Sequence, residues 1–246
     1  MRQQDKIPFR KIISMVSLLN VVSDHVICPV NSNNESDFYE YEYLDETYDL
    51  CIPGCSVCDY LDRFILVLPT DADQRRILWE YLYENHVTDY EHMIDTDHNL
   101  QCIQQMLDIL QNKIHSSELN VLDFGCGTGL SAKAVFPGRI YGYDMNKNMR
   151  EAASQKGMKV MEEKEFWTLP KEYFHGILAS YAFHMAIRVQ EIEKLVFILK
   201  KEGILVANYY KEMDCERINN MLTFFHMSIV ERIEDRRFGQ IYVYRK

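Results

Sequence analysis

Apolar and polar positions follow two different patterns along the chain. Near the start, residues 38–44 alternate between aromatic and acidic side chains, which predicts a half-exposed strand with residues 47–52 as its hairpin partner. Apolar residues at helical spacing then predict helices at 71–85 and 99–115. From residue 120 onward, short apolar runs alternate with helical stretches. This second pattern predicts an α/β fold, with a mostly parallel sheet covered by helices on both faces.

The alternation also sets the order of the elements. The expected strands are 121–124, 140–143, 159–161, 176–181 and 203–208, followed by a closing hairpin of 229–234 and 240–244. The expected helices are 131–135, which starts the first crossover, then 148–156 and 192–200. We divide the chain into an N-terminal segment at 1–68 with a helix at 13–22, a helical linker at 69–115, and the sheet domain at 116–246. Ligands of such sheets bind beyond the carboxyl ends of the strands.

Composition excludes several classes of protein. The chain has 246 residues, of which 47% are hydrophobic, and that is enough for a sizeable core. No apolar run reaches the about 18 residues of a membrane span, and the start of the chain lacks a signal-peptide pattern, so we expect a cytoplasmic protein. The formal net charge of −10 disfavours nucleic acid as a partner. Seven cysteines without a secretory signal do not indicate a disulfide framework.

The main functional signal follows the first strand of the sheet domain. Here Asp123, Gly125, Cys126 and Gly127 form part of the sequence Asp-Phe-Gly-Cys-Gly-Thr-Gly. Glycines at a strand end let the backbone turn sharply and let a ligand come close to it. A dinucleotide-binding loop needs G-x-G-x-x-G, but Leu130 stands at the last glycine position. The loop instead resembles the D-x-G-x-G-x-G loop of class I S-adenosylmethionine-dependent methyltransferases.

That resemblance implies a Rossmann-like fold with a seven-stranded sheet, S-adenosylmethionine as cofactor, and roles for several residues. Asp144 ends the second strand, where its carboxylate accepts the ribose hydroxyls, and Met145 lies against the adenine face. Glu165 matches the family's acceptor of the adenine amine, and Phe166 offers its backbone amide. Ser180, at the end of the fourth strand, lies under the methionine part of the cofactor.

The resemblance covers roughly residues 105–246, with two departures. The fourth strand begins after Phe174 and His175, where the family has Phe-Asp, a position that mainly supports the fold. The segment after that strand, from Ser180 onward, reads Ser-Tyr-Ala-Phe-His instead of the Asn/Asp-Pro-Pro-Tyr motif of amino-methylating enzymes. This second departure argues against methylation of nucleic-acid amines and of protein glutamine.

Methyl transfer requires few catalytic side chains around the reacting atoms. The methyl donor is already activated by its positive sulfur, so the enzyme mainly holds the nucleophile about 3 Å away and in line. A base is needed only if the nucleophile must lose a proton early. His184 and Tyr181, just past the fourth strand, are the candidate catalytic residues, His184 as the base and Tyr181 at the pocket wall. The alternative for His184 is a helix-start residue that binds the backbone.

A cluster of cysteines marks the N-terminal segment. The sulfur ligands available there are Cys28, Cys51, Cys55 and Cys58. The C-x3-C-x2-C spacing also occurs in radical iron–sulfur enzymes, but those build a barrel after the motif. The segment better resembles the N-terminal zinc ribbon of some bacterial methyltransferases that act on sugars or secondary metabolites. Asn31 stands where a second cysteine belongs, so the site either uses the four cysteines, or His25 in place of Cys51, or binds no zinc.

Taken together, these features predict a methyltransferase for a small molecule, such as a sugar or a secondary-metabolite intermediate. The stretch after the fifth strand is short, so we expect residues 1–115 to supply the acceptor selectivity, with Trp79, Tyr83 and Tyr90 as contributors. Two alternatives stay open. One is methylation of a peptide or protein side chain, and the other is a cofactor-binding partner subunit without catalysis.

Overall fold

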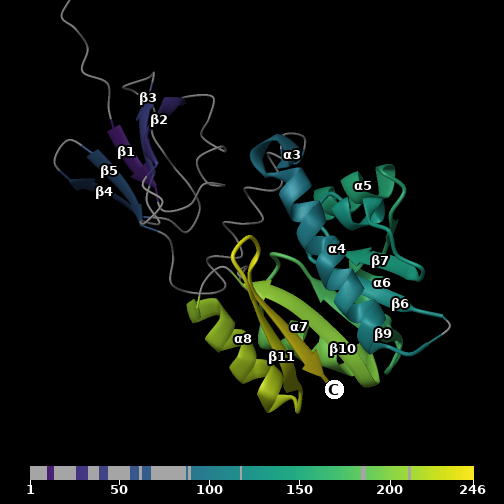
Figure 1. Cartoon of the computed structure of the whole chain (residues 1–246). Helices are drawn as coiled ribbons and strands as arrows, with labels where there is room; N and C mark the ends of the chain where they lie inside the picture. Colours follow the sequence, from purple (N-terminus) through teal and green to yellow (C-terminus); the bar gives the residue numbers. More distant parts are fainter. Residues whose placement is uncertain are drawn as a thin grey trace, which may run out of the picture. The chain divides into compact units, whose positions relative to one another are not determined.

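Figure 1 shows the computed structural model of the chain. It describes residues 10–13, 26–32, 39–43, 56–60, 63–67, 87, 90–116, 118–183, 187–209 and 212–246, with backbone alone before residue 68. The chain divides into two compact units, Met1–His86 and Val87–Lys246, which we describe separately. The expected helix at 71–85 lies outside the described residues, as does 14–22 of the expected N-terminal helix.

The first unit contains a five-stranded sheet with the order β2-β3-β1-β5-β4. Its strands are β1 (Arg10–Ile13), β2 (Val26–Ser32), β3 (Tyr39–Tyr43), β4 (Ser56–Tyr60) and β5 (Arg63–Val67). The alternating stretch at 38–44 forms β3, as its pattern predicts. It pairs antiparallel with both β1 and β2, while its expected hairpin partner at 47–52 lies outside the described residues.

The second unit contains a seven-stranded sheet with the order β11-β12-β10-β9-β6-β7-β8. Its strands are β6 (Asn120–Phe124), β7 (Arg139–Tyr143), β8 (Lys159–Val160), β9 (Phe174–Ala179), β10 (Leu199–Tyr209), β11 (Ser228–Asp235) and β12 (Gly239–Arg245). Strands β6 to β10 run parallel, and the β11–β12 hairpin adds two antiparallel strands. The expected seven-stranded, mostly parallel sheet is confirmed.

Helices connect these strands. They are α3 (Tyr90–Met93), α4 (Thr96–Lys113), the 3-10 helix η2 (Leu130–Lys133), α5 (Lys147–Gln155), α6 (Glu163–Thr168), α7 (Val189–Ile198) and α8 (Glu212–Phe224). Helix α4 begins after Asp95, whose side chain accepts the His98 N–H at 3.0 Å. The helix expected from Ser131 is only the four-residue η2, because Pro137 and Gly138 follow shortly.

Two hydrophobic cores flank the second sheet, because neighbouring residues of a strand point to opposite faces. In β6, Val121 packs with the apolar side of α4, whereas Leu122 packs with residues of α6, α7 and α8. Figure 1 shows α4 lying along the sheet. This packing places residues 90–116 in the same unit as the sheet. None of the described helices combines the length and the apolar character that crossing a bilayer requires.

Candidate functional site

The loop after β6, residues 125–129, folds in a way that only glycine permits at two positions. Gly125 has a φ of 75° and Gly129 a φ of 83°, both in the left-handed region. A Cβ atom on Gly125 would lie 2.6 Å from the Cβ of Ala182, and one on Gly129 would lie 2.9 Å from the Cβ of Ala153. The glycine loop therefore packs directly against the segment after β9 and against α5, with no space for side chains between them.

Two neighbouring strand ends hold the glycine loop. The N–H groups of Gly125 and Cys126 donate to the Tyr143 carbonyl at 2.8 and 3.1 Å. Asp144 follows on β7, and its Oδ2 accepts the Gly127 N–H at 3.0 Å. Its Oδ1 accepts the Asn146 N–H at 2.9 Å. The carboxylate thus joins the loop to the start of α5, and each oxygen keeps a second lone pair for a ligand hydroxyl.

The half-buried position of Asp144 affects its charge. Burial raises the pKa of Asp144, while hydrogen bonds from Asn146 and Gly127 and the charge of Arg150 lower it in part. Asn146 also caps α5, since its Oδ1 accepts the Met149 N–H at 3.1 Å. Backbone donors around this carboxylate therefore favour its charged form against the effect of burial.

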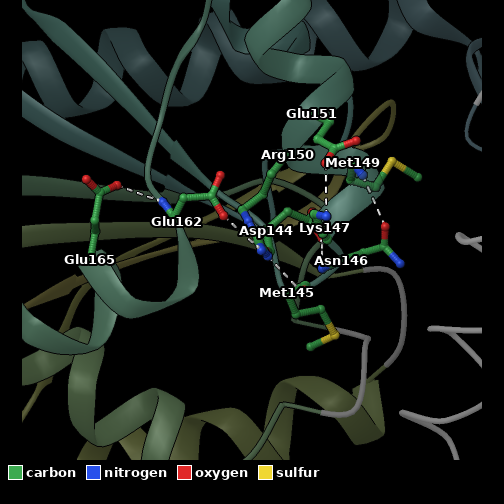
Figure 2. Close-up of polar contacts among 9 residues, drawn as sticks. All are labelled: Asp144, Met145, Asn146, Lys147, Met149, Arg150, Glu151, Glu162 and Glu165. Atoms are coloured by element: carbon green, nitrogen blue, oxygen red, sulfur yellow. Dashed lines mark hydrogen bonds and ion pairs between the residues drawn. The ribbon is translucent and has the colours of Figure 1, made fainter.

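Arg150 holds the backbone of Asp144 and Met145 in place. This role was not predicted from the sequence. Only 5% of its surface is exposed. Its Nη1 donates to the carbonyls of Asp144 at 2.8 Å and Met145 at 3.1 Å, and its Nη2 lies 3.3 Å from the Glu162 carboxylate (Figure 2). The available signal was an arginine on the buried side of the helix expected at 148–156, where an apolar residue is the rule.

The two residues expected at the adenine amine lie in α6. Glu165 Oε2 accepts the Glu162 N–H at 2.9 Å, as Figure 2 shows, and the Phe166 N–H donates to the Glu162 carbonyl at 2.9 Å. The Phe166 ring stacks on Tyr143 with centroids 3.9 Å apart, and Trp167 meets Phe166 edge-on at 5.2 Å. Both groups thus form hydrogen bonds within the first turn of α6. In the sequence, Glu162 is the first carboxylate after β8.

Asp123 and Cys126 lie beneath the loop. Asp123 is 3% exposed and accepts the Ser131 hydroxyl. Burial, with a smaller contribution from the nearby Asp144, raises the pKa of Asp123 to about 7, although the hydrogen bond from Ser131 lowers it in part. Burial also raises the pKa of the Cys126 thiol well above its usual value, and this side chain packs with Ala153 and Met158. Both residues support the loop from the protein side.

A second group of residues gathers where β9 and β10 end, and we call it the β9–β10 end. Tyr181 has a φ of 52°, unusual for a bulky residue, and its N–H donates to Asn208 Oδ1 at 2.7 Å. Asn208 is 2% exposed, and its Nδ2 donates to the Phe238 carbonyl at 3.4 Å and to Cys102 Sγ at 3.5 Å. The buried Ser180 hydroxyl has no hydrogen-bond partner among the described residues. Asn208 was missed as a functional residue, although a polar residue ending an apolar strand was a visible signal.

His184 and two of the cysteines lie outside the described residues. The ends of the His184 segment are described. Arg217 Nη1 donates to the Ile187 carbonyl at 3.0 Å, and its Nη2 to the Phe183 carbonyl at 3.4 Å. Helix α8 therefore holds both ends of that segment.

The four expected zinc ligands fall in two groups. Cys51 and Cys55 lie outside the described residues. Cys28 is in β2 and Cys58 in β4, the two edge strands of the first sheet. A single zinc site that uses both would need these edges to meet. The side chains that the structure describes contain no cluster of three histidine, cysteine or acidic residues that could hold a metal ion.

Part of this chain is similar to known methyltransferases. Residues 122–207 match the family model of a methyltransferase domain. An uncharacterized methyltransferase of Bacillus pumilus is 32% identical over 106 residues, which is 40% of this chain and 50% of that protein. An uncharacterized methyltransferase of Bacillus mycoides is 36% identical over 103 residues, or 40% and 47%. The chain thus spans about half the length of the curated relatives it matches.

A solved structure supports the fold independently. The N-methyltransferase NodS of Bradyrhizobium japonicum, crystallised with S-adenosyl-L-homocysteine, superposes with a TM-score of 0.54 at 16% identity. The match covers 68% of this chain and 97% of NodS. At this identity it establishes the fold alone. Residues 122–207 of this chain thus match a methyltransferase domain, and the second unit that contains them has the fold that NodS has.

Proposed function

We propose that this chain transfers the methyl group of S-adenosylmethionine to a small-molecule acceptor. The observation that carries the proposal is the junction between the glycine loop and Asp144, in which Gly127 donates to Oδ2 at 3.0 Å. This contact brings a closely approachable backbone next to a carboxylate with free lone pairs, which suits a ligand that carries a pair of hydroxyls.

The residues around this junction fit a bound nucleoside. Asp144 would accept the ribose hydroxyls, Met145 would lie against the adenine, and the backbone of Gly125 to Gly127 would face the rest of the cofactor. Glu165 would meet the adenine amine through Oε1, because its Oε2 accepts the Glu162 N–H, and Phe166 would offer its backbone amide only if that N–H left the Glu162 carbonyl. Asp123 and Cys126 would support the loop, and the buried Ser180 hydroxyl would face the methionine part.

The chain's own part in the chemistry is mainly to position the acceptor. Bound S-adenosylmethionine supplies a methyl carbon that is activated by the adjacent positive sulfur. Tyr181 would orient the acceptor from the β9–β10 end, where Asn208 fixes its backbone. His184 would take up the acceptor's proton if the nucleophile must lose one. A small molecule is favoured because the segment after β9 lacks the motif of amine-methylating enzymes for nucleic acids and glutamine.

Binding of S-adenosylhomocysteine tests the cofactor half of the proposal. We expect the intact chain to bind it in calorimetry, and we expect Asp144→Asn to weaken binding by about tenfold or more, because a charged acceptor of hydroxyl donors is lost. Glu151→Gln is the matched control, since it removes one carboxylate from an exposed pair with Lys147 on α5. Equal affinities of all three proteins would contradict the assignment of Asp144.

Transfer itself is tested with radiolabelled methyl donor in cell extract from the source organism. Label in the low-molecular-weight fraction is the expected result. Label in the protein fraction would instead favour peptide or protein side chains as acceptors, and binding without any transfer would favour a non-catalytic partner subunit.

A structural zinc ion in the first unit is part of the same proposal, with ligands among Cys28, Cys51, Cys55 and Cys58. Thiolates in tetrahedral arrangement would stabilise a small unit, because metal binding adds directly to its folding free energy. Elemental analysis of purified protein decides it. About one zinc ion per chain supports the site, and protein with fully reduced cysteines and no zinc refutes it.

A further inference from the structure

The carboxylate of Glu91 joins a short helix ahead of α4 to the glycine loop. Glu91 of α3 accepts two hydrogen bonds on Oε1, one from the Thr128 hydroxyl at 2.9 Å and one from Lys156 Nζ at 2.6 Å. Thr128 belongs to the glycine loop, and Lys156 directly follows α5. We call these three residues the Glu91 clasp. It joins three segments that are far apart in the sequence.

The clasp places an aromatic ring against the loop. Tyr90 precedes Glu91, and its Cε1 lies 3.6 Å from the point that a Cβ on Gly127 would occupy. Gly127 is also the residue whose N–H donates to Asp144. The glycine loop is thus contacted at one residue by the carboxylate expected to bind the ribose and by the ring of Tyr90.

The attachment is weak enough to open. Helix α3 has four residues, too few to be stable without outside contacts. Glu91 and Lys156 keep 30% and 36% of their side-chain surface exposed, so salt weakens their attraction, whereas Thr128 is 3% exposed. Lys156 holds the pKa of Glu91 below its usual value, which keeps the carboxylate charged near neutral pH. The position of α3 therefore depends on a contact that water and ions can reach.

We propose that Glu91 is a positioning residue, which holds Tyr90 over the glycine loop and slows release of the cofactor. This inference rests on the proposed function, since it assumes that the loop binds S-adenosylmethionine. Opening the clasp removes Tyr90 from the loop and exposes the bound ligand to water. Higher ionic strength then shortens the residence time of the cofactor, because it weakens the ion pair between Glu91 and Lys156.

The test measures the dissociation rate of S-adenosylhomocysteine from the full chain by stopped-flow at low and high salt. We expect Glu91→Ala to speed release about tenfold, the effect of losing hydrogen bonds to a charged group. Glu91→Gln keeps an acceptor for Thr128 and should fall in between. Release from the unaltered chain should become faster with salt, whereas release from Glu91→Ala should not. Glu151→Gln is the control for the loss of one negative charge.

The exchanged pair Glu91→Lys with Lys156→Glu separates positioning from a general loss of stability. It restores opposite charges, and a lysine at position 91 can donate to the Thr128 hydroxyl oxygen. The clasp is supported if Lys156→Glu alone releases S-adenosylhomocysteine fast and the exchanged pair releases it at a rate close to that of the unaltered chain. Release from Glu91→Ala at the unaltered rate, or no rescue by the exchanged pair, overturns it. If the unaltered chain does not bind S-adenosylhomocysteine at all, the proposed function itself is refuted.

Discussion

The glycine loop and the β9–β10 end lie at the same edge of the sheet, but their polar groups are satisfied to different extents. At the glycine loop, Gly125, Cys126 and Gly127 all donate their N–H groups to acceptors on or just after β7. At the β9–β10 end, the Ser180 hydroxyl is buried without a partner among the described residues, and Tyr181 has a left-handed backbone. Among the described residues, the loop N–H groups all have acceptors, whereas the β9–β10 end keeps a buried hydroxyl without one.

Under the proposed function, this difference suggests which region binds the cofactor and which binds the acceptor. A loop that is held by internal hydrogen bonds is preorganised, so ligand binding costs little ordering there. Strained backbone and unsatisfied buried groups cost free energy, and they persist where function requires them. If the proposed function holds, the glycine loop suits the cofactor, which many enzymes share, and the β9–β10 end suits the acceptor.

The largest effect on cofactor binding should come from adding a side chain to the glycine loop, where the packing leaves no space for one. Gly125→Ala places a Cβ within 2.6 Å of Ala182 on a backbone with positive φ, so the loop must move. We expect S-adenosylhomocysteine binding, measured by calorimetry, to weaken by about a hundredfold or more.

Gly157→Ala is the matched control, because Gly157 has a similar φ of 87° but no atom within 4 Å of the added Cβ. Its cost should be limited to backbone strain, about 1 kcal/mol of folding free energy, with binding unchanged. If both variants lose binding alike, close packing at the loop is not what the cofactor site requires.

A smaller and more selective effect is expected from Asn208→Ala. This change removes the acceptor of the Tyr181 N–H and two donors, so Tyr181 should leave its strained conformation. We expect methyl transfer to fall about tenfold with little change in S-adenosylhomocysteine binding, and stability to fall by about 1–3 kcal/mol.

Asn219→Ala serves as its control. Asn219 is an amide on α8 that donates to Cys215 Sγ at 3.3 Å and accepts the Tyr244 hydroxyl. It should lose stability without a selective loss of transfer. An equal loss of transfer in both variants would mean that Asn208 acts only through stability.

A last effect concerns stability against pH and leaves ligand binding aside. The pKa of Asp123 is about 7 in the folded chain, against about 3.9 for an unfolded aspartate. Between these values the folded state keeps a proton that the unfolded state has released. Stability should therefore decrease as pH rises through this window, by about 1.4 kcal/mol per pH unit from this group. In urea unfolding at several pH values, Asp123→Asn should remove that slope, and an unchanged slope would contradict the assignment.

Local patterns predicted the elements of the second unit, because the apolar period depends on which face each residue buries. Helix α4 was expected at 99–115 and spans Thr96–Lys113, and β6 was expected at 121–124 and spans Asn120–Phe124. Strand β9 was expected to reach Tyr181 but ends at Ala179, because Tyr181 takes a positive φ that no local pattern marks. Helix α8 was missed, since 212–224 was read as a connecting segment.

The glycine loop and Asp144 could be found in the sequence because they form a contiguous motif and a strand end. The residues that hold them could not be found in this way. Arg150 acts on backbone carbonyls that any sequence would supply, and Glu91 meets Thr128 37 positions away. Such contacts depend on how the elements pack, and a single sequence carries no signal for the distance between them.

The aromatic stack behind the glycine loop makes the protein suited to optical study. Tyr143, whose carbonyl accepts two loop N–H groups, stacks on Phe166, and Phe166 touches the 40% exposed indole of Trp167. The emission of that indole responds to the polarity around it. The chain has one other tryptophan, Trp79, so Trp79→Phe leaves a single tryptophan, which three successive contacts connect to the loop. Ligand titrations can then be followed without any label.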